Sequence, residues 1–270
     1  MPAEAPLPFT AVVLAAQRNG RLDPMAEEAG VTHKCLVPIL GRPLLDYVLE
    51  ALARVPGLER IRICIEPEAV VAVRAVRGAN GELGIPVDYV PSQATITESA
   101  YASAQGVDGA ILITTADNVN LTPGAVEALL ARLAAGADGA FAMTRKEAVL
   151  AAHPEGQRRF YELSDGAYSN CNIYAIAGPQ VLRMAEVFRE GGQFVRNPGR
   201  LVRTVGLFNI LLFRFKLVSL KGAMKRLSAR LGLTIEAVPL EDGAHAVDVD
   251  NPRTYKIAEA ILLKKQAAKA

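Results

Sequence analysis

The stretch Thr10-Ala11-Val12-Val13-Leu14-Ala15-Ala16-Gln17-Arg18-Asn19-Gly20-Arg21 decides the fold. It begins as an apolar, β-branched run typical of a buried strand and continues into a loop of small residues with two arginines. Lys34 follows, just before a second apolar run at Val37-Pro38-Ile39. Free backbone amides and nearby cations are the groups that match the negative charges of a triphosphate. We therefore interpret this stretch and Lys34 as a triphosphate-binding turn.

Short apolar runs alternate with helical patterns through the first half of the chain. Strands are predicted at residues 11–15, 61–65, 87–90 and 110–114. Helices are predicted from Arg42-Pro43 to about residue 55, and over residues 68–77, 96–105 and 124–135, the last one capped by Thr122-Pro123. Strands separated by helices of this length predict an α/β fold with a doubly wound, mostly parallel sheet.

The pattern is less regular in the second half. We expect a strand at 141–144, an irregular polar segment at 145–170, a strand at 169–176 and a helix at 179–189. Two or three basic helices are predicted within 197–231, then a strand at 234–238 and a terminal helix from Thr254. Repeats and low-complexity linkers are absent, which favours one domain over residues 1–270 with a basic helical subregion at 191–235.

Composition narrows the class of protein. The chain has 270 residues, 51% of them hydrophobic, which is enough to bury a large core. Cys35, Cys64 and Cys171 match no metal or disulfide spacing, so we expect buried thiols in a reducing compartment. The first residues lack a signal-peptide pattern, and the apolar run at 205–213 is too short to span a bilayer and stops at Arg214. A cytoplasmic protein is predicted.

The net charge of +2 conceals a local positive segment, because residues 191–235 carry nine basic and no acidic side chains. Residues 206–217 mix bulky apolar side chains with Arg214 and Lys216. This pattern favours a helical lid or dimer face whose apolar side packs inward, with weak contact between residues 199–230 and an anionic membrane surface as the alternative. A net charge near zero and 6% aromatic residues argue against a nucleic-acid partner. The oligomeric state is left open.

Candidate ligands gather where the strands end. In an open parallel sheet, ligands bind beyond the carboxyl ends of the strands, so Arg18 and Arg21 should converge with Asp117, which follows the strand at 110–114. Lys34 suits the role of a point charge on phosphate. Asp117 suits Mg²⁺, which prefers few carboxylates, several waters and phosphate oxygens. A second acidic group is available at Asp248 or Asp250, just before the last helix.

A family resemblance rests on these elements. Leu14-Ala15-Ala16 with its polar turn, Lys34 before Val37-Pro38-Ile39, and Gly41-Arg42-Pro43-Leu44-Leu45 resemble the nucleotidyltransferases of the molybdenum-cofactor (MobA-like) and sugar-phosphate type. Their opening reads Leu-Ala-Ala-Gly-x-Gly-x-Arg, then Pro-Lys and Gly-x-Pro-(Leu/Met)-(Leu/Ile). Asp117, the Asn-x-Gly-like element at 170–174 and the Asp-x-Asp element at 248–252 follow in the family's order.

The resemblance implies a Rossmann-like nucleotide-diphospho-sugar transferase fold. It also implies transfer of a nucleoside monophosphate from a nucleoside triphosphate to a phosphorylated small-molecule acceptor, such as a sugar phosphate, alcohol phosphate or cofactor, with release of pyrophosphate. The implied catalytic residues are Lys34, Arg18 and Arg21, and the implied metal ligands for Mg²⁺ are Asp117, Asp250 and Asp248, with Asp250 preferred to Asp248. Asn170 and Asn172 would contact the acceptor. The nucleotide would bind Leu14, Ala15, Ala16, Gln17, Lys34, Ser92, Gln93 and Asp117.

Three departures from the family pattern keep alternatives open. Gln17 stands at the first glycine, residues 22–31 are an extra segment, and Asn172 replaces the glycine of the Asn-x-Gly element. A catalytically degenerate nucleotide-binding or regulatory protein on the same fold is therefore the main alternative. A glycosyltransferase is a third reading, disfavoured by the Lys34 element and by Asp117-Asn118-Val119 where an Asp-x-Asp would be expected.

Overall fold

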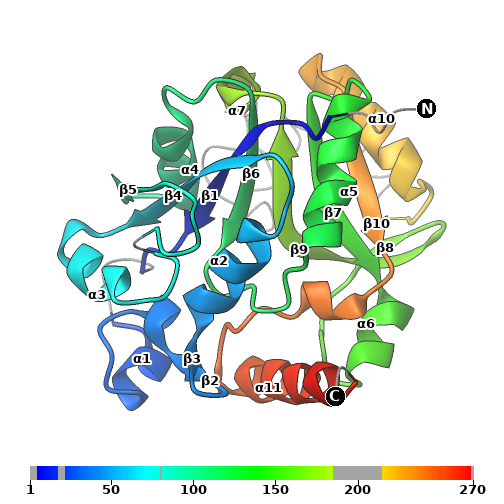
Figure 1. The fold of residues 1–270 in the computed structure, drawn as a ribbon. Helices are drawn as coiled ribbons and strands as arrows, with labels where there is room; N and C mark the ends of the chain where they lie inside the picture. The colour runs from blue at the N-terminus through cyan, green and yellow to red at the C-terminus, as the bar shows by residue number, and fades with distance from the viewer. Residues whose placement is uncertain (1–4, 18–21, 80, 185–214, 269–270) are drawn as a thin grey trace.

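The computed structural model describes residues 5–17, 22–79, 81–184 and 215–268. Its centre is an eight-stranded sheet of order β10-β7-β9-β6-β1-β4-β5, with β8 paired to β9 (Figure 1). β1 (Phe9–Leu14) lies between the parallel strands β4 (Leu58–Ile65) and β6 (Ala110–Thr115), and β5 (Val87–Pro91) extends the parallel part. β9 (Gly166–Ile176) runs antiparallel to β6 and to β7 (Gly139–Arg145), and β7 pairs in parallel with β10 (Ile235–Leu240). The predicted α/β, mostly parallel sheet is confirmed.

Successive residues of β1 pack into two different cores, because side chains of a strand alternate between its faces. Ala11 and Val13 join the core that includes α2 (Leu44–Ala53) and α5 (Pro123–Ala134). Val12 joins the core on the opposite face, which includes α4 (Ile96–Ala104) and α7 (Pro179–Met184). A strand buried on both faces explains why residues 11–14 are uniformly apolar.

A further layer packs at the edge where the parallel strands end. It contains α1 (Pro24–Glu28), the hairpin β2 (Pro38–Ile39) and β3 (Arg42–Pro43), the short turn η6 (Gly243–Ala246) and α11 (Pro252–Ala267). Buried Ile39, Leu44, Val247 and Ile257 belong to one apolar cluster in this layer. In Figure 1, α11 lies below the sheet, beside β2 and β3. Several segments of this layer pass close to the ends of the parallel strands, and they position the candidate site there.

Three predicted elements are corrected by the structure. Residues 145–170 are only partly irregular: they contain α6 (Lys146–Ala152), β8 (Tyr161–Leu163) and the start of β9, and only residues 153–160 and the turn before β9 lack helix or strand. The β8–β9 hairpin turns at Ser164-Asp165 ahead of Gly166, whose φ of 140° suits glycine. The predicted helix at 68–77 is a short turn, η3 (Pro67–Ala69), followed by α3 (Val70–Arg74). Arg42–Pro43 is not helical but pairs with β2 across a turn in which Leu40 and Gly41 both have positive φ (48° and 76°).

Only the last part of the basic segment is described. Residues 191–214 lie outside the described residues, and α10 (Leu220–Leu231) is the basic helix that the structure describes within 215–231. It begins at the cap Ser219 and docks on the β8–β9 hairpin, where the carboxylate of Asp165 accepts a hydrogen bond from the Leu220 N–H (3.0 Å). Phe215 and Leu217 are exposed just before it. No helix in the described ranges is long and apolar enough to cross a membrane.

Other expectations concern thiols and caps. Cys35, Cys64 and Cys171 are free and buried, and burial raises the pKa of Cys35 to about 12. Thr122 caps α5 through Ala125 N–H as predicted, and Asn251 caps α11 in a capping box with Thr254. The organisation of the chain as one domain stays a prediction.

Ile63 lies in β4, which pairs with β1 on one side and β5 on the other, and it provides a test of the core. Its side chain is fully buried in the sheet core. We expect Ile63→Ala to lower the free energy of unfolding by about 2–5 kcal/mol, because it leaves a cavity that the sheet cannot close. Val71→Ala, at a side chain that is 83% exposed, should change it by less than about 0.5 kcal/mol. Urea unfolding followed by circular dichroism measures both; equal effects would contradict the described core.

Stability should also fall in mild acid because of His245. This buried imidazole lies 3.3 Å from the Thr122 hydroxyl. Burial lowers its pKa from 6.5 to about 4, against the opposing effect of Asp242. Between pH 6.5 and pH 4, His245 binds a proton in the unfolded chain but not in the folded chain. The folded state therefore keeps its full stability above pH 6.5 and loses stability as the pH falls towards 4. We expect a loss of about 2 kcal/mol from pH 7.5 to pH 5 from this residue.

The variant His245→Gln separates this effect from the titration of carboxylates. It should flatten the dependence of unfolding free energy on pH between 5 and 7.5, measured by urea unfolding at each pH. A wild-type slope in the variant would contradict the assignment.

Candidate functional site

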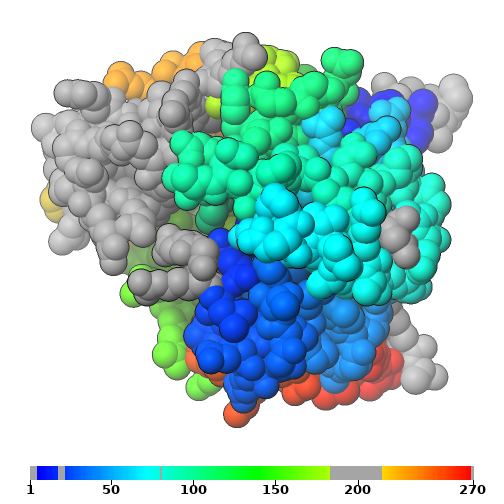
Figure 2. Space-filling model, turned by 90° about the vertical axis from the view of Figure 1, so that its left-hand side faces the viewer, coloured from blue at the N-terminus to red at the C-terminus, as the bar shows by residue number. Residues whose placement is uncertain are grey.

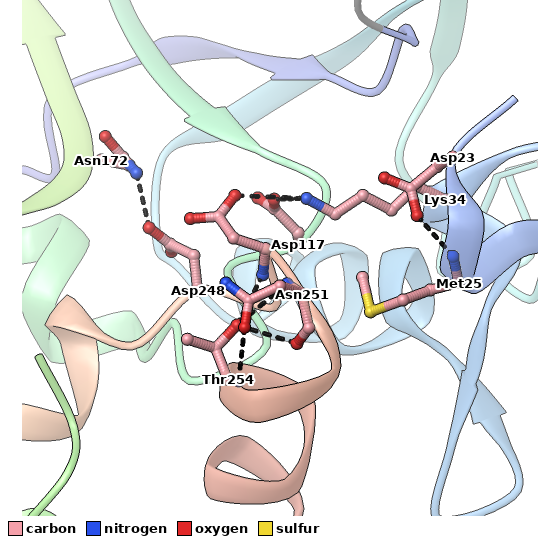
Figure 3. Close-up of polar contacts among 9 residues, drawn as sticks. Asp23, Met25, Lys34, Asp117, Asn172, Asp248, Asn251 and Thr254 are labelled. Carbon is pink, nitrogen blue, oxygen red and sulfur yellow. Dashed lines mark hydrogen bonds and ion pairs between the residues drawn. The ribbon is translucent and has the colours of Figure 1, made fainter. Parts of the chain in front are cut away.

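Lys34 lies at the centre of a charged cluster. It opens the short turn η2 (Lys34–Leu36), and its Nζ lies 2.5 Å from Asp117 Oδ2 and 3.3 Å from Asp250 Oδ1. Asp117 follows β6, and its carbonyl accepts a hydrogen bond from Val249 N–H (3.1 Å), which holds the loop of Asp250 against it. Figure 3 shows Lys34 reaching towards these carboxylates from the side of Asp23 and Met25. Three segments distant in the sequence therefore meet at one point.

The charge state of Lys34 follows from this geometry. Partial burial disfavours the ammonium ion, but the carboxylates of Asp117 and Asp250 outweigh that effect and raise its pKa above 10.5. Lys34 is therefore cationic at neutral pH. Its side chain keeps 21% of its surface exposed, so a ligand that enters from solvent can reach it.

Asp248 is more deeply buried than Asp117 and Asp250. Its Oδ2 accepts a hydrogen bond from Asn172 Nδ2 at 2.5 Å, on the side of the carboxylates away from Lys34 (Figure 3). Burial, followed by the nearby charges of Asp117 and Asp250, holds the pKa of Asp248 well above its ordinary value. Additional positive charge at this position would favour the ionised carboxylate.

The chemistry of the acidic groups fits a hard cation. Asp117 Oδ1 and Asp248 Oδ1 are buried and have no hydrogen-bond partner. Such oxygens are costly unless they are paired, and Mg²⁺ is held by one or two carboxylates with waters and substrate phosphates. Within the described ranges, no group of three or more histidine, cysteine, aspartate or glutamate side chains is arranged to hold a metal by itself. A cation here would thus draw most of its ligands from water and substrate.

A bulge in β9 aims Asn172 at Asp248. Three residues of β9 face one residue of β7, between the pairs Phe141↔Tyr174 and Met143↔Asn170. Asn172 has a φ of 51°, a left-handed conformation that asparagine tolerates better than most residues and glycine adopts freely. Asn170 Nδ2 donates to Asn172 Oδ1 (3.0 Å) and to the Tyr174 hydroxyl (2.5 Å). The two asparagines predicted to contact the acceptor thus form one hydrogen-bonded group beside Asp248.

The loop after β1 lies beside the same cluster. Leu14 O accepts from Ala116 N–H (3.0 Å) and Ala15 N–H donates to Cys64 O (2.9 Å), so the strand end is fixed to both neighbouring strands. Ala16 and Gln17 continue from there, partly exposed. Arg18 and Arg21 lie outside the described residues.

Ser92 and Gln93 lie apart from the charged cluster. They follow β5 at the edge of the sheet, with β4 between β5 and β1. Ser92 N–H donates to Ile65 O (3.1 Å), and Gln93 N–H donates to the Ser99 hydroxyl at the start of α4 (2.9 Å). Both residues remain at the carboxyl edge, where part of a bound nucleotide could extend.

Several residues that organise the site were missed from the sequence. Asn118 Nδ2 donates to Cys171 O (3.0 Å), and Asn120 Nδ2 donates to Val247 O (3.4 Å), so these buried side chains fasten the Asp117 loop to β9 and to the acidic loop. Two asparagines directly after a buried strand were the available signal. Glu66 and His33, which lie beneath the β1 loop, carried no recognisable motif.

Known structures share this architecture. A structure described as a hypothetical transferase from Thermus thermophilus has a TM-score of 0.73 and 26% identity, over 92% of this chain and 100% of that one. The 4-diphosphocytidyl-2C-methyl-D-erythritol synthase of Anaerococcus prevotii has a TM-score of 0.60 and 13% identity, over 95% and 96%. A CMP:2-keto-3-deoxy-manno-octonic acid synthetase complexed with CTP has a TM-score of 0.60 and 17% identity, over 96% and 99%. The latter two show the fold alone.

No curated protein matches the chain significantly. The family model described as "MobA-like NTP transferase domain" matches residues 11–192, which include the β1 loop, Lys34, Asp117 and the β9 asparagines. Together with the nucleotidyltransferase fold, this match confirms the resemblance seen in the sequence. The chain belongs to the MobA-like NTP transferase domain family.

Proposed function

We propose that this protein transfers a nucleoside monophosphate from a nucleoside triphosphate to a phosphorylated small-molecule acceptor and releases pyrophosphate. The observation that carries the proposal is Lys34, held between Asp117 and Asp250 at the carboxyl edge of the sheet in a member of this family. Lys34, Arg18 and Arg21 are proposed as catalytic residues, the last two by resemblance. The β1 loop from Leu14 to Gln17, with Ser92, Gln93 and Asp117, is proposed to bind the nucleotide.

The charges of the site support a cation alongside the nucleotide. One ammonium group faces three aspartates, and a triphosphate brings several further negative charges. Phosphate oxygens would be repelled unless added positive charge offsets the carboxylates. We propose that Asp117 and Asp250, with Asp248 behind them, hold Mg²⁺. The ion, when bound, neutralises charge on the phosphates.

The protein's own groups then position the reactants. The Lys34 ammonium is proposed to donate to phosphate oxygens and to stabilise charge as pyrophosphate departs. A phosphate monoester is already anionic at neutral pH, so its oxygen can attack the α-phosphorus in line without a general base. Asn172 lies on the side of Asp248 away from Lys34, and Asn170 donates a hydrogen bond to Asn172. Both asparagines are proposed to orient the acceptor.

A nucleotide-binding protein without turnover is the second candidate, and Gln17 is the observation that favours it. Gln17 stands where the family has glycine, and its backbone N–H, a potential phosphate donor, is bonded to Glu66 (2.9 Å). The two candidates differ in one measurement. Saturable binding of a triphosphate without pyrophosphate release, across a panel of phosphorylated acceptors, would select the non-catalytic protein.

Asp117 gives the first test of the proposed reaction. Asp117→Asn keeps the size of the side chain but removes the charge that faces Lys34 and the cation. We expect pyrophosphate release to fall at least about 100-fold, because a charge-positioning group at the reacting phosphates is lost. The matched control is Asp108→Asn, an exposed aspartate away from the site, which should keep wild-type activity. Wild-type turnover in Asp117→Asn would refute the assignment.

The cation is tested by binding rather than by turnover. Isothermal titration should show triphosphate binding that weakens at least about tenfold when Mg²⁺ is removed with EDTA, since uncompensated carboxylates then face the phosphates. Asp250→Asn should reduce this dependence on Mg²⁺. Equal affinity with and without the ion in the wild-type protein would contradict a role for these aspartates in holding it.

A further inference from the structure

Glu66 joins two segments that flank the proposed phosphate site. It directly follows β4, and its side chain is only 17% exposed. Glu66 Oε1 accepts a hydrogen bond from Gln17 N–H (2.9 Å), and Glu66 Oε2 lies 3.5 Å from His33 Nε2. Gln17 ends the described part of the β1 loop and His33 directly precedes Lys34. One carboxylate therefore contacts the chain on both sides of the extra segment.

A second contact closes the same junction. Gln17 Nε2 donates to Thr32 O (2.9 Å), and the ring of His33 lies 3.0 Å from the Thr32 hydroxyl. His33 is buried and is the N-cap residue directly before η2, so its position determines where the Lys34 side chain starts. In Figures 1 and 2, the blue α1 segment lies against the cyan region that contains α3, which follows Glu66 in the chain.

These contacts explain the residue at position 17. The side-chain amide of Gln17 donates a hydrogen bond to Thr32 O, so it is already paired within the protein. A glycine here would leave Thr32 without this donor. A mostly buried carboxylate beside a triphosphate site repels phosphate. Among the described residues, Glu66 makes no hydrogen bond or ion pair with Lys34. Glu66 instead contacts the backbone N–H of Gln17 and the ring of His33, which suits a residue that holds these two segments in place.

We propose that Glu66, with Gln17 and His33, is a positioning clamp that sets Lys34 against the reacting phosphates. Glu66 holds both the β1 loop and His33 in place. Because His33 directly precedes η2, its position fixes the backbone from which the Lys34 side chain extends. Gln17 is then an adaptation to the extra segment at residues 22–31 and not a mark of lost activity. This inference rests on the proposed transfer reaction.

The experiment compares three glutamate variants for turnover and for backbone hydrogen exchange. Glu66→Ala removes the clamp. We expect kcat for pyrophosphate release to fall about 10- to 100-fold, because a small displacement of a catalytic group is enough for such losses. KM for the triphosphate should change less than about threefold, since the loss falls on the transition state. Exchange of amides in residues 22–34 should become faster, measured without nucleotide.

Two matched variants separate positioning from general damage. Glu66→Gln keeps an oxygen that can accept from Gln17 N–H and should restore kcat to within about threefold of wild type. Glu68→Gln, an exposed glutamate in η3 two residues further on, should match wild type in both readouts. If Glu66→Ala does not fold, Gln17→Ala takes its place, because it removes the bond to Thr32 and should also speed exchange in residues 22–34.

Two results would overturn the clamp. One is unchanged exchange in residues 22–34 of Glu66→Ala, or of Gln17→Ala where the first variant does not fold. The other is wild-type kcat in a folded Glu66→Ala. Failure of the proposed function is seen separately: wild-type protein that releases no pyrophosphate with any triphosphate and acceptor refutes the reaction, and the exchange readout then decides on the clamp alone.

Discussion

The ion pairs of Lys34 with Asp117 and Asp250 are the interaction on which the site depends. They join three segments that are 83 and 216 residues apart in the chain. Each segment reaches that point for a different local reason: a short turn for Lys34, the end of β6 for Asp117, and the approach to the capped helix α11 for Asp250. The pairing neutralises charge on partly buried side chains, and it brings an ammonium group and two carboxylates together at the carboxyl edge of the sheet.

The sheet explains why these charges are together. Parallel strands end at the same edge, so the loops after β1 and β6 emerge side by side, and Ala116 N–H bonds to Leu14 O. The antiparallel β9 passes the same edge in the opposite direction. Its bulge turns Asn172 towards Asp248, in a left-handed conformation that fits both asparagine and the family's glycine. The backbone at position 172 would therefore also accept a glycine.

The sequence predicted the sheet and the members of the charged cluster well, because strong apolar runs mark the buried strands and the family elements occur in order. It predicted the second half less well. β8 has only three residues and pairs with the start of β9, and the Ser164-Asp165-Gly166 turn was the local signal for this hairpin. The helix start at Leu44 depended on an unexpected hairpin at Leu40 and Gly41. The contacts of Glu66 and the orientation of Gln17 depend on residues distant in the chain, so no local pattern could reveal them. For Arg18, Arg21 and residues 191–214, which lie outside the described residues, the predictions stand untested.

We propose that Lys34 binds a triphosphate, and the aspartates a cation, in place of the ion pairs they form with each other. A crystal structure with Mg²⁺ and a nucleoside triphosphate that has a non-hydrolysable α,β-bridge tests this proposal most directly. We predict Lys34 Nζ within about 3 Å of a phosphate oxygen and the ion on Asp117 and Asp250. A triphosphate bound elsewhere, with Lys34 still paired to both carboxylates, would contradict it.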